Sequence, residues 1–322
     1  VGRPAVLMCF VPACFEILGM LVLAPRLLGI TVLEAAIMGS VVAAVSPAVI
    51  VPKMIRLMEE GYGTDNSIPQ LILAGASVDD VFVIVLFSAF TGLAQGGRVS
   101  PVSFVQIPGS ILAGILIGCG AGVLLALYFK QVHIRDTVKV IILLCISFIL
   151  VTLEDSLKGA FTFSSLISVM CMGISLQKRR GPVAMRLSVK FNKLWVGAEI
   201  LLFVLVGATV DVSYAVSAGA AVILLILGVL VFRMAGVMCC LVRTRLSLKE
   251  RLFCMVAYMP KATVQAAIGG VPLSMGLACG NIVLTVAVLS ILITAPLGAF
   301  LIDLTYQRWL TCETHGAEPG RP

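Results

Sequence analysis

Long apolar stretches, separated by short polar segments, run through almost the whole chain. A helix that crosses a hydrocarbon core about 30 Å thick needs roughly 20 mostly apolar residues. Charged and turn-forming residues bound ten runs of about this length, which predict ten transmembrane helices. Their approximate ranges are 5–23, 27–51, 68–94, 103–129, 138–153, 160–177, 194–210, 214–241, 251–270 and 281–304. The pattern predicts an all-α integral membrane protein.

Lysine and arginine are distributed very unevenly between the loops. When successive loops are placed on alternate sides of the membrane, one side receives eighteen of these residues and the other receives only Arg26, Arg98 and Lys158. Cytoplasmic loops carry an excess of Lys and Arg, so both ends of this chain are expected in the cytoplasm. We expect a multi-pass protein of the plasma (inner) membrane. The topology accounts for the net charge of +7, so no nucleic-acid partner is indicated.

The composition excludes a water-soluble domain. Of the 322 residues, 60% are hydrophobic and 12% are charged, and the mean hydropathy is +1.12. Ten cysteines form no C-x-x-C motif and are accompanied by only two histidines, so neither a zinc site nor a disulfide framework is indicated. No cofactor is expected. The chain begins at Val1 with neither an initiator methionine nor a signal peptide, so we expect an N-terminal piece to be absent.

Two of the predicted helices are interrupted near their middle by proline with small or polar neighbours. Ser46-Pro47 interrupts 27–51, and Pro260-Lys261-Ala262-Thr263 interrupts 251–270. One interpretation is a pair of ordinary proline kinks. The other is a pair of discontinuous helices whose half-helix ends meet at the membrane midplane and form an ion site.

The positions of these breaks favour the second interpretation. Each broken helix is second in a triplet, and the first helix of each triplet carries one charge, Glu16 or Arg233. The two triplets are separated by an odd number of helices, so they have opposite orientations in the membrane. This arrangement is the inverted repeat found in many secondary transporters.

Asp79 and Asp80 are the most unusual residues of the chain. They lie roughly 17 Å along a helix from Ile68, near the membrane midplane, where a charge is unfavourable by about 2.5–3.5 kcal/mol. Adjacent carboxylates resist ionisation at that depth, so at least one should take up a proton near physiological pH. Once deprotonated, its oxygens suit Na⁺, and proton and cation would compete for one place. The alternative is a pair neutralised by permanent salt bridges.

The two carboxylates cannot have the same role, because adjacent helical residues point about 100° apart. We expect one to bind the transported ion and the other to face a neighbouring helix or a cationic partner. Arg233 either forms a buried ion pair with Glu16 or faces Asp79. Lys261 is expected to compensate the carbonyl end of the first half of its broken helix.

Three further features have structural interpretations. Glu34 and Glu199 lie near membrane ends and are expected to be structural. Gly114, Gly118 and Gly122 form one small face of 103–129, which predicts close helix packing without chemistry.

Six segments carry a family resemblance and follow one another in order along nearly the whole chain. They are Ala44–Pro52 (AVSPAVIVP), Gly61–Gly63 (GYG), Ala76–Asp80 (ASVDD), Leu205–Ala208 (LVGA), Met259–Gly269 (MPKATVQAAIG) and Leu289–Pro296 (LSILITAP). The chain resembles the cation/proton antiporter superfamily with the NhaA-like fold, and most closely its NHA-type sodium/proton exchangers. The long Pro-Lys-Ala-Thr-Val-Gln-Ala-Ala match is the most specific, and the N-terminal scaffold helices of the relatives would precede this chain.

The resemblance implies a fold and a site. The fold has two crossed discontinuous helices beside the aspartate helix, in a core that moves like an elevator against a scaffold, and the full-length form would be a homodimer. Asp80 would be the principal site for the proton and the transported cation, with Asp79 as its companion. In many electrogenic relatives a lysine replaces Arg233 and pairs with the first aspartate, and in many electroneutral ones that aspartate is asparagine, so the resemblance leaves the stoichiometry open.

The same resemblance implies a division of the chain. Residues 1–95 would form the first half of the ion-translocating core, 96–212 the linking and scaffold or dimer-domain helices, 213–306 the second half of the core, and 307–322 a cytoplasmic tail. The expected function is exchange of Na⁺, Li⁺ or K⁺ for H⁺ by alternating access.

Two other classes of function were weighed. An intramembrane aspartyl protease needs two carboxylates face to face, which adjacent residues on one helix do not provide. A cation channel needs a continuous polar pore, whereas single charges on broken helices suit alternating access better. Another ion-coupled transporter also fits the pattern.

Overall fold

A computed structural model describes residues 2–94, 101–132, 134–157, 163, 165–209 and 212–312. Apart from one isolated bridge between Tyr62 and Cys312, the regular structure in these residues is helical. The helices are α1 (Gly2–Met8), α2 (Val11–Leu28), α3 (Val32–Val42), α4 (Pro47–Glu59), α5 (Ile68–Ala94), α6 (Pro101–Gln131), α7 (Asp136–Leu157), α8 (Ser165–Arg179), α9 (Gly181–Thr209), α10 (Val212–Leu241), α11 (Leu248–Ala257), α12 (Thr263–Ile268), α13 (Val271–Ser274) and α14 (Gly280–Trp309). Of the predicted tail, residues 313–322 lie outside the described part of the chain.

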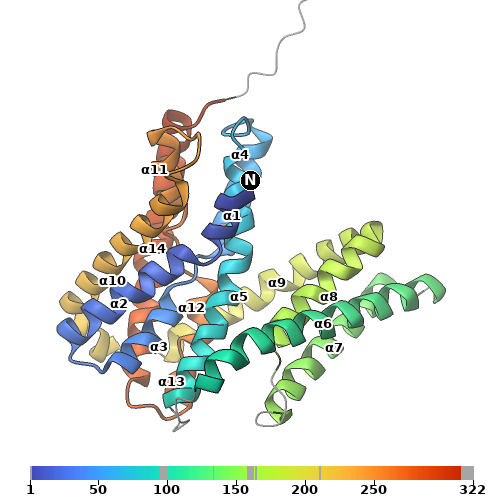
Figure 1. The fold of residues 1–322 in the computed structure, drawn as a ribbon, viewed down its shortest axis with the longest axis horizontal. Coiled ribbons are helices and arrows are strands. Elements are labelled where there is room, and N and C mark those ends of the chain that lie inside the picture. Colours follow the sequence, from blue (N-terminus) through green and yellow to red (C-terminus); the bar gives the residue numbers. More distant parts are fainter. Residues whose placement is uncertain are drawn as a thin grey trace, which may run out of the picture. The chain divides into compact units, whose positions relative to one another are not determined.

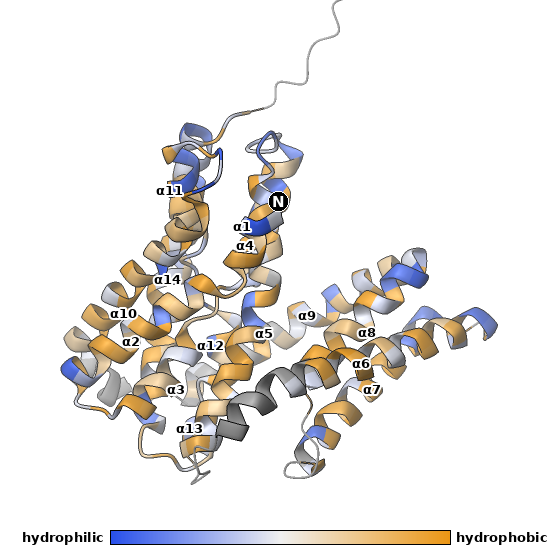
Figure 2. Cartoon of the chain, in the orientation of Figure 1, coloured by the Kyte–Doolittle hydropathy of each residue, from blue (hydrophilic) through white to orange (hydrophobic). Residues whose placement is uncertain are grey.

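Seven segments of the described chain are long and apolar enough to cross a membrane. They are Gly2–Leu28, Val32–Glu59, Ile68–Ala94, Leu112–Gln131, Asp136–Glu154, Gly219–Leu241 and Gly280–Trp309. Figure 2 shows hydrophobic residues along such helices and hydrophilic residues concentrated near helix ends. These segments match seven of the ten predicted spans.

The other three predicted spans, 160–177, 194–210 and 251–270, do not meet this criterion among the described residues, so the count of ten is not confirmed. In two of them the described helix is short: α8 has 15 residues, and 251–270 is split into α11 and α12, with 10 and 6 residues. A broken span yields no continuous apolar helix even where the sequence is apolar throughout.

The first predicted helix, 5–23, is also broken, which the sequence pattern did not predict. α1 ends at Met8 and α2 begins at Val11, with Pro12 in the first turn of α2. Proline is tolerated in a first helical turn because the amide it removes has no intrahelical partner there. The corresponding helix of the second triplet, α10, is continuous from Val212 to Leu241, so the two copies of the repeat differ at this position.

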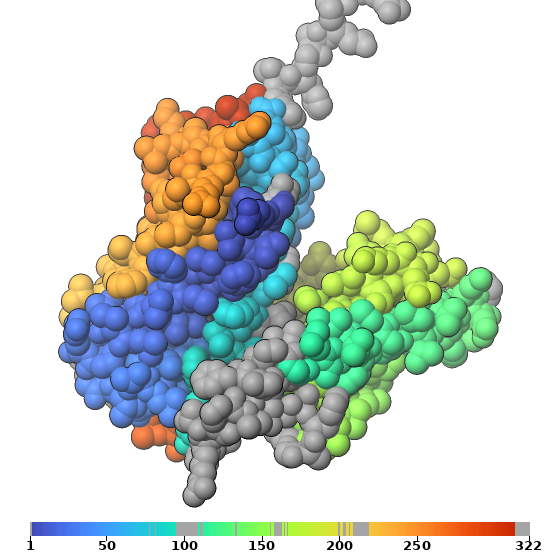
Figure 3. Space-filling view, viewed as in Figure 1, coloured from blue at the N-terminus to red at the C-terminus, as the bar shows by residue number. Residues whose placement is uncertain are grey.

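The chain divides into two compact units. One unit contains residues 1–96 and 202–322, and the other contains residues 97–201. In the first unit, helices from the two ends of the sequence intermix, because α2 packs along α10 and α3 packs against both α5 and α14 (Figure 1). Figure 3 shows the blue N-terminal helices in direct contact with the orange and gold helices of the second triplet.

Small residues allow the close approach of α2 and α10. A Cβ atom at Gly19 would lie 2.7 Å from Cγ of Phe232, and one at Gly236 would lie 2.9 Å from Cα of Pro12. Around this contact, Met20, Ala24 and Val229 belong to one buried apolar cluster. Glycine at helix interfaces permits this separation in membranes, where packing rather than the hydrophobic effect holds helices together.

The second unit is built around the pair α6 and α8. The predicted small face of α6 lies against the α8 backbone: a Cβ atom at Gly118 would contact Ser168 O and approach Ser168 Cα to 2.7 Å, and one at Gly122 would approach Ser175 Cβ to 2.6 Å. The Ser168 hydroxyl also donates a hydrogen bond to Gly114 O at 3.0 Å. The glycine spacing therefore correctly predicted a close helix contact.

Gly118→Ala is expected to destabilise this unit by about 1–3 kcal/mol, because the added methyl group overlaps the α8 backbone, which cannot move aside cheaply. Gly120→Ala is the matched control on the same helix, since nothing lies within 4 Å of its Cβ position. Thermal melting in detergent should show a lower midpoint for Gly118→Ala only. Equal midpoints for the two variants would contradict the close contact.

Candidate functional site

The two broken helices of the first unit meet at their breaks. α3 ends at Val42 and α4 begins at Pro47, whereas α11 ends at Ala257 and α12 begins at Thr263. The amide of Ser46 donates a hydrogen bond to the carbonyl of Pro260 at 2.8 Å, so each break supplies a partner for the other. Breaking a helix exposes amides and carbonyls that must find partners away from water.

Gln265 supplies a second link between the breaks. From α12, its Nε2 donates to the carbonyls of Val42 (3.1 Å) and Ala44 (2.8 Å), which lie at the end of α3. Gln265 is fully buried. Gln265 was not among the predicted site residues. A side-chain amide inside an apolar run, a few residues after a break, is nevertheless a signal that a backbone group needs a partner. Similarly, Thr294 of α14 accepts a hydrogen bond from the Lys261 amide at 3.0 Å.

Four charged side chains form a continuous buried cluster beside the breaks. Arg233 of α10 donates to Glu16 of α2 at 2.7 Å and to Asp79 of α5 at 2.9 Å. Lys261, in the α11–α12 break, lies 2.5 Å from the same Glu16 oxygen. All four side chains are at most 1% exposed. The two alternatives for Arg233 are thus both present, since one guanidinium binds Glu16 and Asp79 together.

Arg233 also neutralises the backbone at both breaks. Its Nε donates to the carbonyl of Tyr258 at 2.7 Å, and its Nη1 donates to the carbonyl of Ala43. From the sequence, Lys261 was expected to compensate the carbonyl end of α11. In the structure Arg233 binds that end, and the Lys261 ammonium binds Glu16 instead. A planar guanidinium with five donors can serve several acceptors at once, whereas a carboxylate is the stronger acceptor for an ammonium.

Asp79 and Asp80 have different surroundings. Oδ2 of Asp79 accepts hydrogen bonds from the Val45 amide at 2.9 Å and from Arg233, and Asp79 is fully buried. Asp80 is only partly buried and forms no ion pair within the described part of the chain. The angle between adjacent helical positions turns Asp79 toward the break and Asp80 away from Arg233.

Four buried oxygen atoms around the breaks have no hydrogen-bond donor among the described residues. They are Ser46 Oγ, Asp79 Oδ1, Asp80 Oδ1 and Gln265 Oε1. Buried polar atoms without partners are rare in proteins, so each one calls for an explanation. Carboxylate, hydroxyl and amide oxygens are the ligands preferred by hard cations, and a proton on a carboxylate could also be shared with such acceptors.

The remaining predicted residues have defined places. Pro47 is the first residue of α4, Pro260 lies in the second break against Gly298 of α14, and Thr263 is the buried first residue of α12. Glu34 forms a capping box with Thr31 at the start of α3, with a 2.8 Å bond from the Thr31 amide. The side chain of Glu199 lies outside the described part of the structure.

Broken helices that cross beside buried carboxylates, in a bundle of membrane-spanning helices, define a membrane protein with a secondary-transporter fold. A family model described as "Sodium/hydrogen exchanger, transmembrane" matches residues 1–305, and the chain belongs to this family of transporters.

Known proteins resemble the chain over most of its length. It is 33% identical over 332 residues to sodium/hydrogen exchanger 9B2 of Mus musculus, covering 96% of this chain and 57% of that protein. Human sodium/hydrogen exchanger 9B1 is 33% identical over 302 residues, covering 86% of this chain and 55% of that protein. The chain therefore spans little more than half the length of these curated relatives.

The fold resembles that of a solved antiporter. The sodium proton antiporter MjNhaP1 of Methanocaldococcus jannaschii, in its structure at pH 8, superposes with a TM-score of 0.83. The likeness covers 95% of this chain and 79% of that one at 18% sequence identity. The predicted antiporter fold, with its two crossed discontinuous helices, is thus confirmed.

Proposed function

We propose that this chain is the ion-translocating part of an exchanger that moves Na⁺, or Li⁺ or K⁺, against H⁺, with Asp80 as the shared site. The observation that supports this most strongly is the separation of the two aspartates. Asp79 is held by Arg233 and the Val45 amide, whereas Asp80 has no cationic partner among the described residues. A carboxylate without a fixed counter-ion can take up either a proton or a cation, and both restore neutrality.

The charge balance of the buried cluster supports a one-for-one exchange. Glu16 and Asp79 are balanced by Arg233 and Lys261, so Asp80 carries the unbalanced charge. An unbalanced charge is costly at membrane depth, so Asp80 should cross only when it holds H⁺ or one monovalent cation. We propose that Arg233 stays paired with Asp79 throughout the cycle, which leaves one titrating group. We therefore propose an electroneutral cycle in which one proton is exchanged for one cation.

The broken helices give this site its route to either side of the membrane. The two breaks are joined by hydrogen bonds from Ser46 and Gln265, so they are expected to move together as one body. We propose that the core, residues 1–95 and 213–306, alternates access by an elevator-like movement against scaffold helices within 96–212. The ion is then carried with its ligands and needs no continuous pore.

We also propose a membrane, an orientation and an oligomeric state for this exchanger. The loop charges support a plasma (inner) membrane protein whose two chain ends, including the tail at 307–322, face the cytoplasm. We propose that the full-length form is a homodimer and that the chain works without a bound cofactor, with the cation held only transiently by Asp80. The solved antiporter and the relatives named above support the class of transport.

Reconstitution of the full-length parent in liposomes tests the proposal. With a preset proton gradient, addition of Na⁺ should drive proton movement read by an internal pH dye, and Li⁺ or K⁺ would define the preference. Current recorded on a solid-supported membrane during the same exchange should be absent, because one charge replaces another.

Three results would count against the proposal. If none of the cations produced a change in the pH-dye signal, exchange would be excluded. A steady current that does not depend on the counter-gradient would indicate a channel. A transient current coupled to exchange would indicate a stoichiometry other than one proton per cation.

A further inference from the structure

A basic cavity lies in the second unit, at the ends of four helices. Its volume is about 440 Å³, and its charged lining residues are Arg135, Asp136, Lys139, Arg180 and Arg186. Four cations thus face one carboxylate, a surplus of three positive charges. None of these residues belongs to the exchange site proposed above.

The protein itself leaves part of this charge unsatisfied. Asp136 binds both Lys139 (3.1 Å) and Arg186 (2.8 Å), so one carboxylate serves two cations. Arg180 donates to the Phe129 carbonyl through Nη2 at 3.2 Å, but its Nε is buried without a hydrogen-bond partner. Arg135 is exposed, and no side-chain partner is found for it among the described residues. These two arginines have donors to spare for an anion.

The geometry suits a phosphate in particular. Lys139 is almost completely buried and lies over the Phe129 ring at 5.6 Å, so it adds fixed positive charge inside the cavity. α7 and α9 both begin here, at Asp136 and Gly181, and helix N-termini favour anions. An arginine guanidinium can donate two parallel hydrogen bonds to two oxygens of one phosphate. Basic cavities between membrane helices are suited to acidic lipid headgroups.

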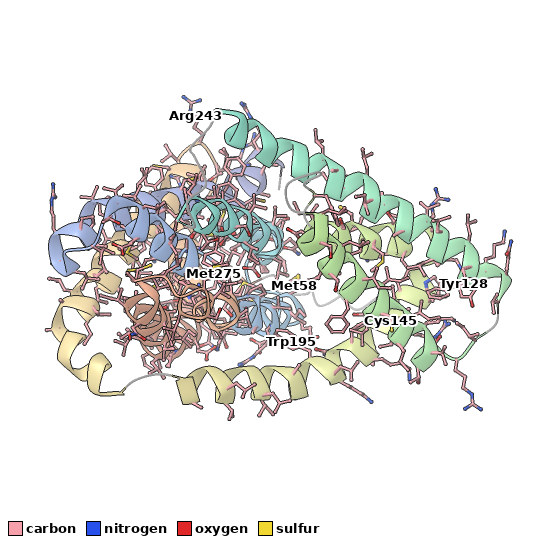
Figure 4. The ribbon with its side chains drawn as sticks, turned by 90° about the horizontal axis from the view of Figure 1, so that it is seen from below. Met58, Tyr128, Cys145, Trp195, Arg243 and Met275 are labelled. Atoms are coloured by element: carbon pink, nitrogen blue, oxygen red, sulfur yellow. The ribbon has the colours of Figure 1, made fainter. Side chains whose placement is uncertain are left out.

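A second, apolar groove is lined by residues of α7 and α9, two of the helices that also line the basic cavity. It measures about 680 Å³ and is lined by Leu144 of α7 and by residues of α9 from Ser188 to Ala198, including Val189, Leu194 and Trp195. Along α9 the groove begins two residues after Arg186 and extends roughly 15 Å. Figure 4 labels Cys145 on α7 and Trp195 on α9, the two helices that border it. Lys190 of α9 binds the Thr137 hydroxyl of α7 at 3.1 Å between the two regions.

We propose that these two regions form one binding site for an anionic phospholipid, with its phosphate between Arg135 and Arg180 and an acyl chain in the α7–α9 groove. A zwitterionic lipid carries its own cation and would leave the surplus charge unbalanced. A free phosphate would leave the apolar groove unfilled. All the residues that line this site belong to the second unit.

Fluorescence from Trp195 tests this directly. The chain has two tryptophans, so Trp309→Phe leaves Trp195, which lines the groove and is 42% exposed, as the single reporter. In detergent micelles, titration with phosphatidylglycerol brominated on its acyl chains should quench Trp195 at low mole fraction. Phosphatidylcholine with the same brominated chains should quench only at much higher mole fraction.

Charge variants in this background identify the headgroup contacts. Arg135→Gln and Arg180→Gln should each weaken quenching by phosphatidylglycerol about tenfold or more, because each removes charge-assisted hydrogen bonds. Arg135→Gln alone keeps the test valid if Arg180→Gln fails to fold, since Arg135 has no other described side-chain contact. The matched control is Arg243→Gln with Arg245→Gln, two exposed arginines of the first unit, where Arg243 extends from the surface (Figure 4).

Each other outcome overturns the proposal. Equal quenching by the two lipids, or unchanged quenching in the arginine variants, would show that the charges do not select the lipid. Competition by free glycerol phosphate at equal concentration would indicate an aqueous anion site. Quenching by neither lipid would mean that the groove is covered, as by a second copy of the chain.

Discussion

Asp80→Asn should reduce cation-driven proton movement in liposomes to the level of protein-free vesicles. Asparagine nearly matches the shape of aspartate but cannot take up or release a proton, and it provides no net charge for a cation. Among the described residues Asp80 forms no ion pair, whereas the neighbouring acids Glu16 and Asp79 are both paired, so neither is free to replace it. The measurement is the initial rate of internal pH change after addition of Na⁺.

A second acid-to-amide substitution provides the control. Asp303→Asn removes an exposed carboxylate that pairs with Lys53 at 2.6 Å, a surface contact worth about 0–1 kcal/mol. Its exchange rate should be close to that of the unmodified protein. If Asp80→Asn retained exchange at the Asp303→Asn rate, with equal amounts of folded protein, the assignment of Asp80 would be wrong.

Arg233→Met should have the largest effect on stability. The guanidinium is the shared partner of Glu16 and Asp79 and also binds backbone carbonyls at both breaks. Its removal leaves Asp79 buried without a cation, and breaking a buried charge pair in this way typically destabilises a protein by about 3–5 kcal/mol. Thermal melting in detergent should show a large fall in the midpoint, or no folded protein at all.

A second substitution at Asp79 shows how much of the destabilisation by Arg233→Met comes from the unpaired carboxylate and how much from the change in side-chain shape. In the double variant Arg233→Met with Asp79→Asn, the stranded carboxylate is gone, and the midpoint should recover a substantial part of its loss. Arg56→Met breaks an exposed pair with Glu60 and should cost little. Should the double variant melt below Arg233→Met alone, the attraction between Arg233 and Asp79 would not be a stabilising contact.

The sequence predicted much of the fold because its strongest signals act along a single helix. Apolar length located the spans, and the predicted range 68–94 coincides with α5. Proline with small neighbours located the breaks at Ser46 and Pro260, because proline removes a helical hydrogen bond wherever it stands. Glycine at every fourth position correctly indicated a close helix contact on α6, although the sequence did not indicate that the partner is α8.

The sequence did not determine which charged side chains bind one another. That depends on the direction in which each side chain points from its helix and on partners far away along the chain. Depth identified Asp79, Glu16 and Arg233 as unusual, but Arg233 lies 217 residues from Glu16 and 154 from Asp79. Helical periodicity fixes the angle between two adjacent residues of one helix. It does not tell which of the two faces a given neighbouring helix. The sequence therefore could not decide whether Arg233 pairs with Glu16 or with Asp79. In the structure its planar guanidinium binds both carboxylates.

Other omissions have local causes. The break between α1 and α2 was missed because Pro12 falls in a run that is apolar on both sides, which hides the interruption from a hydropathy pattern. Gln265 was missed because its role is to pair with carbonyls of another broken helix, and those carbonyls become unsatisfied only in the folded structure. The capping box of Thr31 and Glu34 was also not predicted, since Glu34 was expected only to be structural near a membrane end.

The hydrogen bond from the Ser46 amide to the Pro260 carbonyl also bears on biosynthesis. The first break is synthesised more than 200 residues before its partner, and until then the Ser46 amide, the carbonyls of α3 and the carboxylate of Asp79 lie in the membrane without their final partners. Before α10 to α12 are synthesised, α1 to α5 are thus an unfinished half of the core that needs shelter from lipid. We expect the core to become resistant to protease only once α12 has been inserted, because α12 and the break before it supply the missing hydrogen-bond partners.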